Sequence, residues 1–273
     1  MSIRLLDVAG KTDPGKVRER NEDSIALDPE LGLYIVADGM GGHNSGEVAS
    51  GLATDTILKF GREMLSKSRE FVPPETDETL SVRARQIVYL IQSANTMIYE
   101  KSKAFAKNQG MGTTVVVVIG DTKSITVGHV GDSRLYRLRG SNFEQLTEDH
   151  SLVQDQVRHG LITKEQADKS NLQNILTRAL GTEPNVLVDT QDIEVQPGDA
   201  FLICSDGMTK MVTDDEAGKV MSNMKEPLDA VDKLIDMSNA AGGVDNVTII
   251  VAAAPGGKPQ DKGLFARLKE ALE

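Results

Sequence analysis

Apolar runs that end in an Asp-Gly pair are a regular feature of this sequence. The two runs are LGLYIVADG at 31–39 and AFLICSDG at 200–207. A short apolar run closed by a turn signal predicts a buried strand followed by a turn. Other segments that are rich in β-branched residues or alternate between apolar and polar positions predict further strands, at 113–121, 124–132, 133–140 and 245–254.

Between these strands, apolar residues recur at helical spacing. This spacing predicts long helices at about 45–65 and 80–98, and shorter ones from 213 onward and from 227 to about 242. Ser45 is a candidate cap for the first helix. Residues 151–181 have a polar helical pattern with few apolar anchors, so we expect a solvated helical excursion from the core.

The order of these elements predicts the fold class. Helices come in pairs and strands in hairpin-like runs, which favours α+β layers with antiparallel sheets covered by helices. We expect one domain over 1–255 and then a linker with a short amphipathic tail at 256–273. A docking helix, a capping element and a disordered tail are all open interpretations of that last segment.

Composition narrows the classes of partner. The formal net charge of −11 argues against nucleic acid and against an anionic membrane surface. The single cysteine, Cys204, excludes an intramolecular disulfide and favours a reducing compartment. No apolar run approaches the roughly 18 residues of a membrane span, and the N-terminus does not fit a secretory signal. We therefore expect a cytoplasmic protein.

Four aspartates share one setting, at an end of a strongly apolar strand: Asp38, Asp132, Asp206 and Asp245. Strand ends bring distant segments together, and clustered carboxylates repel one another unless a cation lies between them. Oxygen ligands suit hard cations such as Mg²⁺ or Mn²⁺. An Asp-Gly pair is also a common turn, but the repetition of the pattern favours a metal site.

The segment RERNED at 18–23 adds a second type of chemistry. The planar guanidinium of Arg18 is suited to binding a phosphate group, and Glu22 and Asp23 are candidates to join the metal site. Glycines in DGMGGH at 38–43 would let the backbone approach a ligand closely.

Two rival phosphate chemistries do not fit the sequence. The segment AGKT resembles the end of a P-loop, but Leu5 stands where that motif needs its first glycine. A cysteine-dependent phosphatase would need an arginine six residues after Cys204, where Lys210 stands.

Taken together, the motifs resemble those of the metal-dependent protein Ser/Thr phosphatases of the protein phosphatase 2C (PPM) family, in their bacterial form. The resemblance runs from about Asp7 to Ala253. It rests on the order of VRERNEDS (17–24), VADGMGGHNSGEVAS (36–50), GMGTTVV (110–116), VGDSRLYRL (130–138), LTEDHS (146–151), LTRALG (176–181), CSDGM (204–208) and DNVT (245–248).

The resemblance implies a fold and a reaction. The fold would be two packed antiparallel β-sheets flanked by helix pairs, in four αββα layers, with a small helical flap at 151–181. The reaction would be hydrolysis of phosphoserine and phosphothreonine in proteins by a metal-activated water. Two Mn²⁺ or Mg²⁺ ions, with a weaker third site, would be the cofactors. Phosphorylated proteins would be the substrates, a Ser/Thr kinase the counterpart, and a monomer the working form.

The resemblance also implies roles for individual residues. The expected ligands are Asp38 bridging two ions, Glu22 and the Gly39 carbonyl on the second ion, Asp206 and Asp245 on the first, and Asp132 with Asp206 at the weaker third position. Asp23 and Asn246 would support the ligands from behind. Arg18 would bind the substrate phosphate, so Arg18 and Asp38 are the expected catalytic residues.

One departure concerns the general acid. Animal members of the family carry a histidine directly after the Asp-Gly pair, where this chain has Met40. His43 and a metal-bound water are the two candidates for protonating the leaving group. His150 is expected to hold a loop, and His159 to be exposed.

Two other functions stay open at this point. A catalytically silent phosphoprotein-binding module on the same fold would be expected to lose a ligand such as Asp206 or Asp245, and none is lost. A metal-dependent hydrolase of small phosphorylated molecules would differ in the depth of its pocket.

Overall fold

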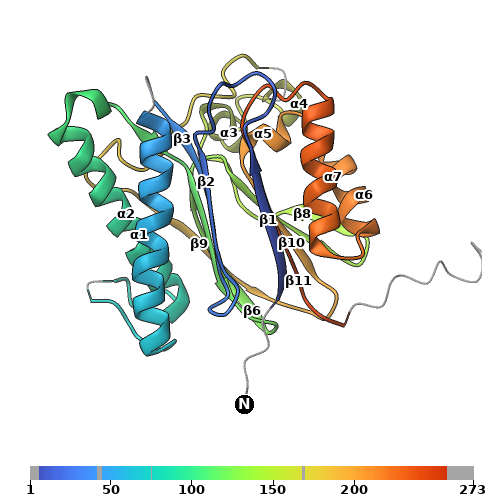
Figure 1. Ribbon diagram of the computed structural model, residues 1–273, viewed down its shortest axis with the longest axis horizontal. Coiled ribbons are helices and arrows are strands. Elements are labelled where there is room, and N and C mark those ends of the chain that lie inside the picture. Colours follow the sequence, from blue (N-terminus) through green and yellow to red (C-terminus); the bar gives the residue numbers. More distant parts are fainter. Residues whose placement is uncertain (1–5, 42–44, 75, 168–169, 257–273) are drawn as a thin grey trace, which may run out of the picture.

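The computed structural model describes residues 6–41, 45–74, 76–167 and 170–256. Within this part of the chain, two antiparallel β-sheets pack face to face. One pair of helices covers the outer face of each sheet (Figure 1). This four-layer α+β arrangement is the predicted fold class.

One sheet has six strands, and β3 lies near its middle. The strand order is β2-β3-β5-β6-β9, with β4 paired to β3. The strands are β2 (Asp23–Asp28), β3 (Leu33–Met40), β4 (Gly112–Thr113), β5 (Val115–Gly120), β6 (Ser124–Val130) and β9 (Asp189–Glu194). Helices α1 (Ser45–Lys67) and α2 (Val82–Ala104) pack on its outer face, and the short 3-10 helix η1 (Ala106–Asn108) follows α2.

Strand β3 is apolar up to Ala37 because both of its faces are covered there. Leu33, Ile35 and Ala37 pack in the cluster under α1 and α2, whereas Tyr34 and Val36 pack between the two sheets. Side chains alternate across a strand, so a strand between a helix layer and a second sheet needs apolar residues at successive positions.

The second sheet has five strands in the order β1-β11-β10-β7-β8. The strands are β1 (Asp7–Asp13), β7 (Arg134–Arg139), β8 (Asn142–Gln145), β10 (Ala200–Cys204) and β11 (Val247–Ala253). Helices α6 (Asp214–Asn223) and α7 (Pro227–Ala240) cover its outer face, and the short helix α5 (Asp206–Thr209) follows β10. Thr213 caps α6 through a capping box with Glu216, and Pro227 opens α7, which agrees with the predicted helix starts.

The flap departs from the sequence prediction. Residues 151–181 were expected to be helical, but in the described part of this segment only α3 (Leu152–Arg158) and α4 (Lys164–Ala167) are α-helices. Gly160 has a φ of 69°, a left-handed conformation that ends α3. One isolated bridge joins the two ends of the flap, Ser151 with Leu176, and another joins Leu180 to Thr113 in the body of the protein.

Two further expectations concern the chain as a whole. None of the helices in the described ranges combines the length and the apolar character that crossing a bilayer requires. The predicted linker and tail at 256–273 lie outside the described residues except for Gly256.

Candidate active site

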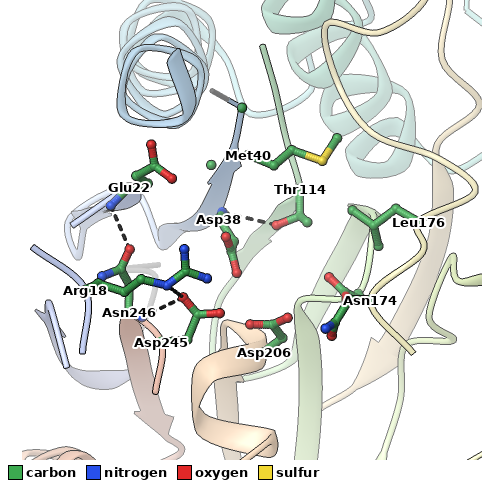
Figure 2. A pocket seen from close by; sticks show the side chains of 13 residues that line it. Arg18, Glu22, Asp38, Met40, Thr114, Asn174, Leu176, Asp206, Asp245 and Asn246 are labelled. Atoms are coloured by element: carbon green, nitrogen blue, oxygen red, sulfur yellow. Dashed lines mark hydrogen bonds and ion pairs between the residues drawn. The ribbon is translucent and has the colours of Figure 1, made fainter. Parts of the chain in front are cut away.

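A pocket of about 220 Å³ lies where residues from both sheets meet. Figure 2 shows Asp38, Asp206, Asp245 and Arg18 pointing into it. All the predicted metal ligands line it, together with Arg18 and Asn246: Glu22, Asp38, Gly39, Asp132, Asp206 and Asp245. The structure therefore brings these residues together, while His43 lies outside the described residues.

Asp38 was predicted at the end of its strand, but it lies inside β3 because this strand continues to Met40. Its position is fixed by hydrogen bonds within the sheet. Its N–H donates to Thr114 Oγ1 (3.1 Å), and its carbonyl accepts from the Thr114 N–H (2.9 Å). Asp38 is partly exposed in the pocket, and its desolvation by the surrounding protein raises its pKa well above the ordinary value. The negative charges of Asp23 and Asp206 raise it further.

Gly39 lets two other segments approach β3. A Cβ at this position would lie 2.2 Å from the Gly46 carbonyl oxygen and 2.5 Å from that of Glu22, so only glycine fits. The Gly39 N–H also donates to the Glu22 carbonyl (3.1 Å). This close approach places Glu22 and the start of α1 beside Asp38.

Asn246 attaches the loop that carries Arg18 and Glu22 to the start of β11. Its Oδ1 accepts from the Glu22 N–H (2.8 Å), and its Nδ2 donates to the carbonyls of Pro14 (2.9 Å) and Arg20 (2.8 Å). In the same region, Arg18 Nε lies 2.9 Å from Asp245 Oδ1 (Figure 2). Asn246 therefore makes three hydrogen bonds to the backbone of this N-terminal segment.

Asp23 is buried behind the ligands. Its Oδ2 accepts from Ser205 Oγ and from Thr248 Oγ1, both at 2.7 Å, and its Oδ1 receives no hydrogen bond from the described residues. Burial raises the pKa of Asp23 to about 6, although the two hydroxyls favour the ionised form.

Asp132 follows β6 in a turn that His150 holds. The His150 N–H donates to the Gly131 carbonyl (3.0 Å), and the Gly131 N–H donates to His150 Nδ1 (3.1 Å). His150 therefore contacts a loop, as predicted. Exclusion of water raises the pKa of Asp132 to about 7, and the charge of Asp206 adds to this effect.

Asp206 and Asp245 are brought together by Gly207. A Cβ on Gly207 would lie 1.9 Å from the Asn246 carbonyl oxygen, so α5 approaches the start of β11 only because this residue has no side chain. Figure 2 shows the two carboxylates next to each other.

Lys210 contacts both of these carboxylates and was not singled out as a site residue. Its Nζ lies 2.5 Å from Asp206 Oδ2 and 3.0 Å from Asp245 Oδ2. Burial would lower the pKa of Lys210, but the two negative charges raise it above its ordinary value. The sequence signal for this contact was the spacing of Lys210, four residues after Asp206 at the end of a short helix, because side chains at this spacing are neighbours on a helix.

The site is suited to hard divalent cations. Its donors are carboxylate and backbone oxygens, the ligands that Mg²⁺ and Mn²⁺ prefer. Asp206 Oδ1 is buried without a hydrogen-bond partner among the described residues, which leaves an acceptor free for a cation. Several carboxylates with raised pKa values also face one another, an arrangement that a bound cation relieves.

A second cluster, His129, His150 and Asp189, has the residue types of a metal site. Its candidate ligand atoms lie within 4.8 Å of one another. However, Arg178 Nη1 lies 2.7 Å from Asp189 Oδ1 and 3.2 Å from His150 Nε2, so a guanidinium already supplies positive charge there. We interpret this cluster as a polar link between the Asp132 turn, the end of the flap and β9.

Comparisons with known proteins identify the family of this chain. Residues 16–241 match the family model of protein phosphatase 2C. The serine/threonine phosphatase stp of Listeria monocytogenes serotype 4b is 37% identical over 244 residues, which cover 88% of this chain and 93% of that protein. The protein phosphatase PhpP of Streptococcus pneumoniae D39 is 31% identical over 257 residues, which cover 93% of this chain and 97% of that protein.

Solved structures show the same fold. The serine/threonine phosphatase Stp1 from Staphylococcus aureus superposes with a TM-score of 0.82 at 31% identity, covering 94% of this chain and 98% of that one. The catalytic domain of the phosphatase PstP, in complex with two manganese ions, gives a TM-score of 0.76 at 31% identity and covers 91% and 98%. The chain belongs to the protein phosphatase 2C family, and it is a phosphoprotein phosphatase.

Proposed function

We propose that this phosphatase hydrolyses phosphoserine and phosphothreonine by direct attack of water, with two Mn²⁺ or Mg²⁺ ions and a weaker third one. The observation that carries this proposal is the convergence of the predicted carboxylates on one pocket, where the pKa of Asp38 is raised well above its ordinary value. The relatives named as serine/threonine phosphatases and the manganese-bound PstP structure support the substrate class and the ions.

The proposed ligand set follows the positions of the side chains. Asp38 lies between the other carboxylates and would bridge two ions. Asp206 and Asp245 would hold one ion, and Glu22 with the Gly39 carbonyl would complete the shell of the other. Asp132 would bind the weaker third ion together with Asp206. Asp23 and Asn246 would keep these ligands in place through the hydrogen bonds described above.

The residues of the chain would contribute binding and orientation. Bound divalent ions lower the pKa of water and offset the charge of the phosphoryl group. Arg18 would leave Asp245 and donate to two phosphate oxygens, and this would orient the phosphorus for in-line attack. His43 and a water molecule stay the two candidates for protonating the leaving oxygen.

Further aspects of the proposal concern the cell. A Ser/Thr kinase would supply the phosphorylated substrates, and the enzyme would act as a monomer in the cytoplasm. Its phosphatase domain would span residues 1–255, with 256–273 as a linker and tail. The named activity of the relatives supports a supply of phosphorylated proteins, since a protein phosphatase requires them as substrates.

Replacement of Asp38 tests the proposed ligand set. We expect Asp38→Ala to lower kcat on a phosphopeptide by more than about 100-fold, because the shared ligand is lost. The fold should persist, as judged by circular dichroism. The control is Asp236→Ala, which removes an exposed carboxylate from α7 and should leave kcat unchanged. A near-normal rate in folded Asp38→Ala would refute the bridging role.

A further inference from the structure

Asp206 and Asp245 already have a cationic partner within the chain. The Lys210 ammonium lies 2.5 Å from one carboxylate and 3.0 Å from the other. The Lys210 N–H donates to the Asp206 carbonyl (2.9 Å), so the end of α5 holds the base of this side chain. The side chain is 27% exposed, and its ammonium contacts the two carboxylates that point into the pocket.

The ammonium contacts the carboxylate oxygens that a divalent ion would bind. An Mg²⁺ ion bonded at about 2.1 Å to either of these Oδ2 atoms would lie within about 5 Å of Nζ. Two cations at this separation repel each other, and because Asp206 and Asp245 are only partly exposed, water screens this repulsion incompletely. A bound ion and the observed position of Lys210 are therefore in competition.

We propose that Lys210 is an internal counter-ion that neutralises Asp206 and Asp245 in the metal-free protein and is displaced when a divalent ion binds. This inference rests on the proposed function, which makes both aspartates metal ligands. Lys210 then has two effects. It stabilises the metal-free fold, and it weakens the binding of the ion, so it sets the cation concentration at which the site fills.

Arg18 is a weaker counter-ion for these carboxylates than Lys210 is. Arg18 contacts only Asp245 in the described structure, and its side chain is 52% exposed. An exposed partner of one carboxylate stabilises it little. Lys210 contacts both carboxylates at once and is less exposed, so it is the stronger competitor for a cation.

Calorimetric titration of the full chain with Mn²⁺ tests the inference. We expect Lys210→Met to lower the Kd for Mn²⁺ by about tenfold or more, because the competing charge is gone. In excess chelator, the variant should also have a lower Tm than the wild type, because two adjacent carboxylates lose their counter-ion. Lys11→Met is the matched control. Lys11 pairs with Asp232 on the surface, and its loss should leave the Kd unchanged.

The outcomes separate this inference from the proposed function. An unchanged Kd in folded Lys210→Met, with normal Mn²⁺ binding by the wild type, would overturn the role of Lys210 alone. If the wild type binds no Mn²⁺ at all, the ligand assignment fails and the inference fails with it.

A measurement on the wild type covers the case in which Lys210→Met does not fold. Acetylation of lysines by an activated ester is followed by mass spectrometry, in chelator and in saturating Mg²⁺. We expect Lys210 to react several-fold faster with Mg²⁺ present, because the displaced ammonium loses its ion pairs, while Lys11 reacts equally in both conditions. Equal reactivity of Lys210 in the two conditions would overturn the proposal.

Discussion

Desolvation raises the pKa values of single aspartates in the pocket and directly behind it. Exclusion of water raises the pKa of Asp132 to about 7 and that of Asp23 to about 6, from ordinary values near 4. Asp38 is shifted in the same direction. A protein that places such groups together without a cation loses free energy, so the metal-free site is a strained arrangement of like charges.

These shifts predict how cation binding depends on pH. A divalent ion binds ionised carboxylates, so below pH 7 it must displace a proton from the proposed ligand Asp132, and nearer pH 6 its charge favours release of the proton from Asp23 behind the ligands. We expect the affinity for Mn²⁺ to fall as the pH is lowered from 8 to 5.5. Binding at pH 6.5 should release protons, which calorimetry in two buffers of different ionisation enthalpy measures. A constant affinity without proton release would contradict these pKa shifts.

The role of Arg18 is tested by separating kcat from KM. We expect Arg18→Ala to raise KM for a phosphopeptide by about 10-fold to 100-fold, because a charge-assisted hydrogen bond to phosphate is lost. Arg62→Ala is the matched control. Arg62 pairs with Asp28, and its side chain is 56% exposed, close to the 52% of Arg18. A large loss of kcat with unchanged KM would instead place Arg18 in the transition state.

At the scale of elements, close contacts between backbones determine which carboxylates meet. The contact between α5 and the start of β11 depends on Gly207, which leaves no room for a Cβ beside the Asn246 carbonyl. The contact between β3 and the start of α1 depends in the same way on Gly39. Both glycines stand next to proposed metal ligands, so small backbone shifts at these positions would separate the ligands.

Adding one methyl group at Gly207 tests this dependence. We expect Gly207→Ala to lower the free energy of unfolding by about 1–3 kcal/mol through overpacking, and to weaken Mn²⁺ binding as Asp206 moves from Asp245. Gly51→Ala is the control. Gly51 lies in α1 with no atom within 4 Å of an added Cβ, so the change should stabilise the helix by about 0.5–1 kcal/mol. Unaltered Mn²⁺ affinity in Gly207→Ala would show that this contact does not position the ligand.

The sequence predicts the interior strands of the sheets better than the strands at the sheet edges. Central strands such as β3 and β5 are apolar along their length, because helices or the other sheet cover both faces. Strands β1 and β9 lie at sheet edges and mix exposed with partly buried residues, so no apolar run marks them. The same lack of apolar anchors explains why the flap contains only two short helices where a longer helical segment was expected.

The residues of the site also divide into those that a local sequence pattern predicts and those that it does not. The aspartates could be predicted because each lies beside an apolar strand, a feature that is local in sequence. Thr114 and Lys210 could not be assigned in this way, since their place in the site depends on contacts made across the fold. Thr114, between β4 and β5, accepts a hydrogen bond from the Asp38 N–H. Lys210 donates a hydrogen bond to Asp245, which lies 35 positions later in the chain.

At the scale of the whole molecule, the sandwich gathers segments from its entire length into one pocket. Arg18 and Glu22 come from near the start of the described chain and Asp245 from near its end, with Asp38, Asp132 and Asp206 between them. Both sheets contribute to the site, so the pocket exists only when the two sheets are packed together. The fold class followed from the element pattern, and the strand-end aspartates indicated a shared site, whereas the individual residue roles were implied by the family resemblance.

The central claim is that this assembled pocket is a divalent-cation-dependent phosphoprotein phosphatase. The most direct measurement is hydrolysis of a phosphoserine or phosphothreonine peptide by the full chain with Mn²⁺, with Mg²⁺ and with excess chelator. We expect phosphate release that requires Mn²⁺ or Mg²⁺, is lost in chelator and returns when the ion is restored. Equal turnover by chelator-treated protein freed of metal, or no turnover by folded protein saturated with either ion, would contradict the account.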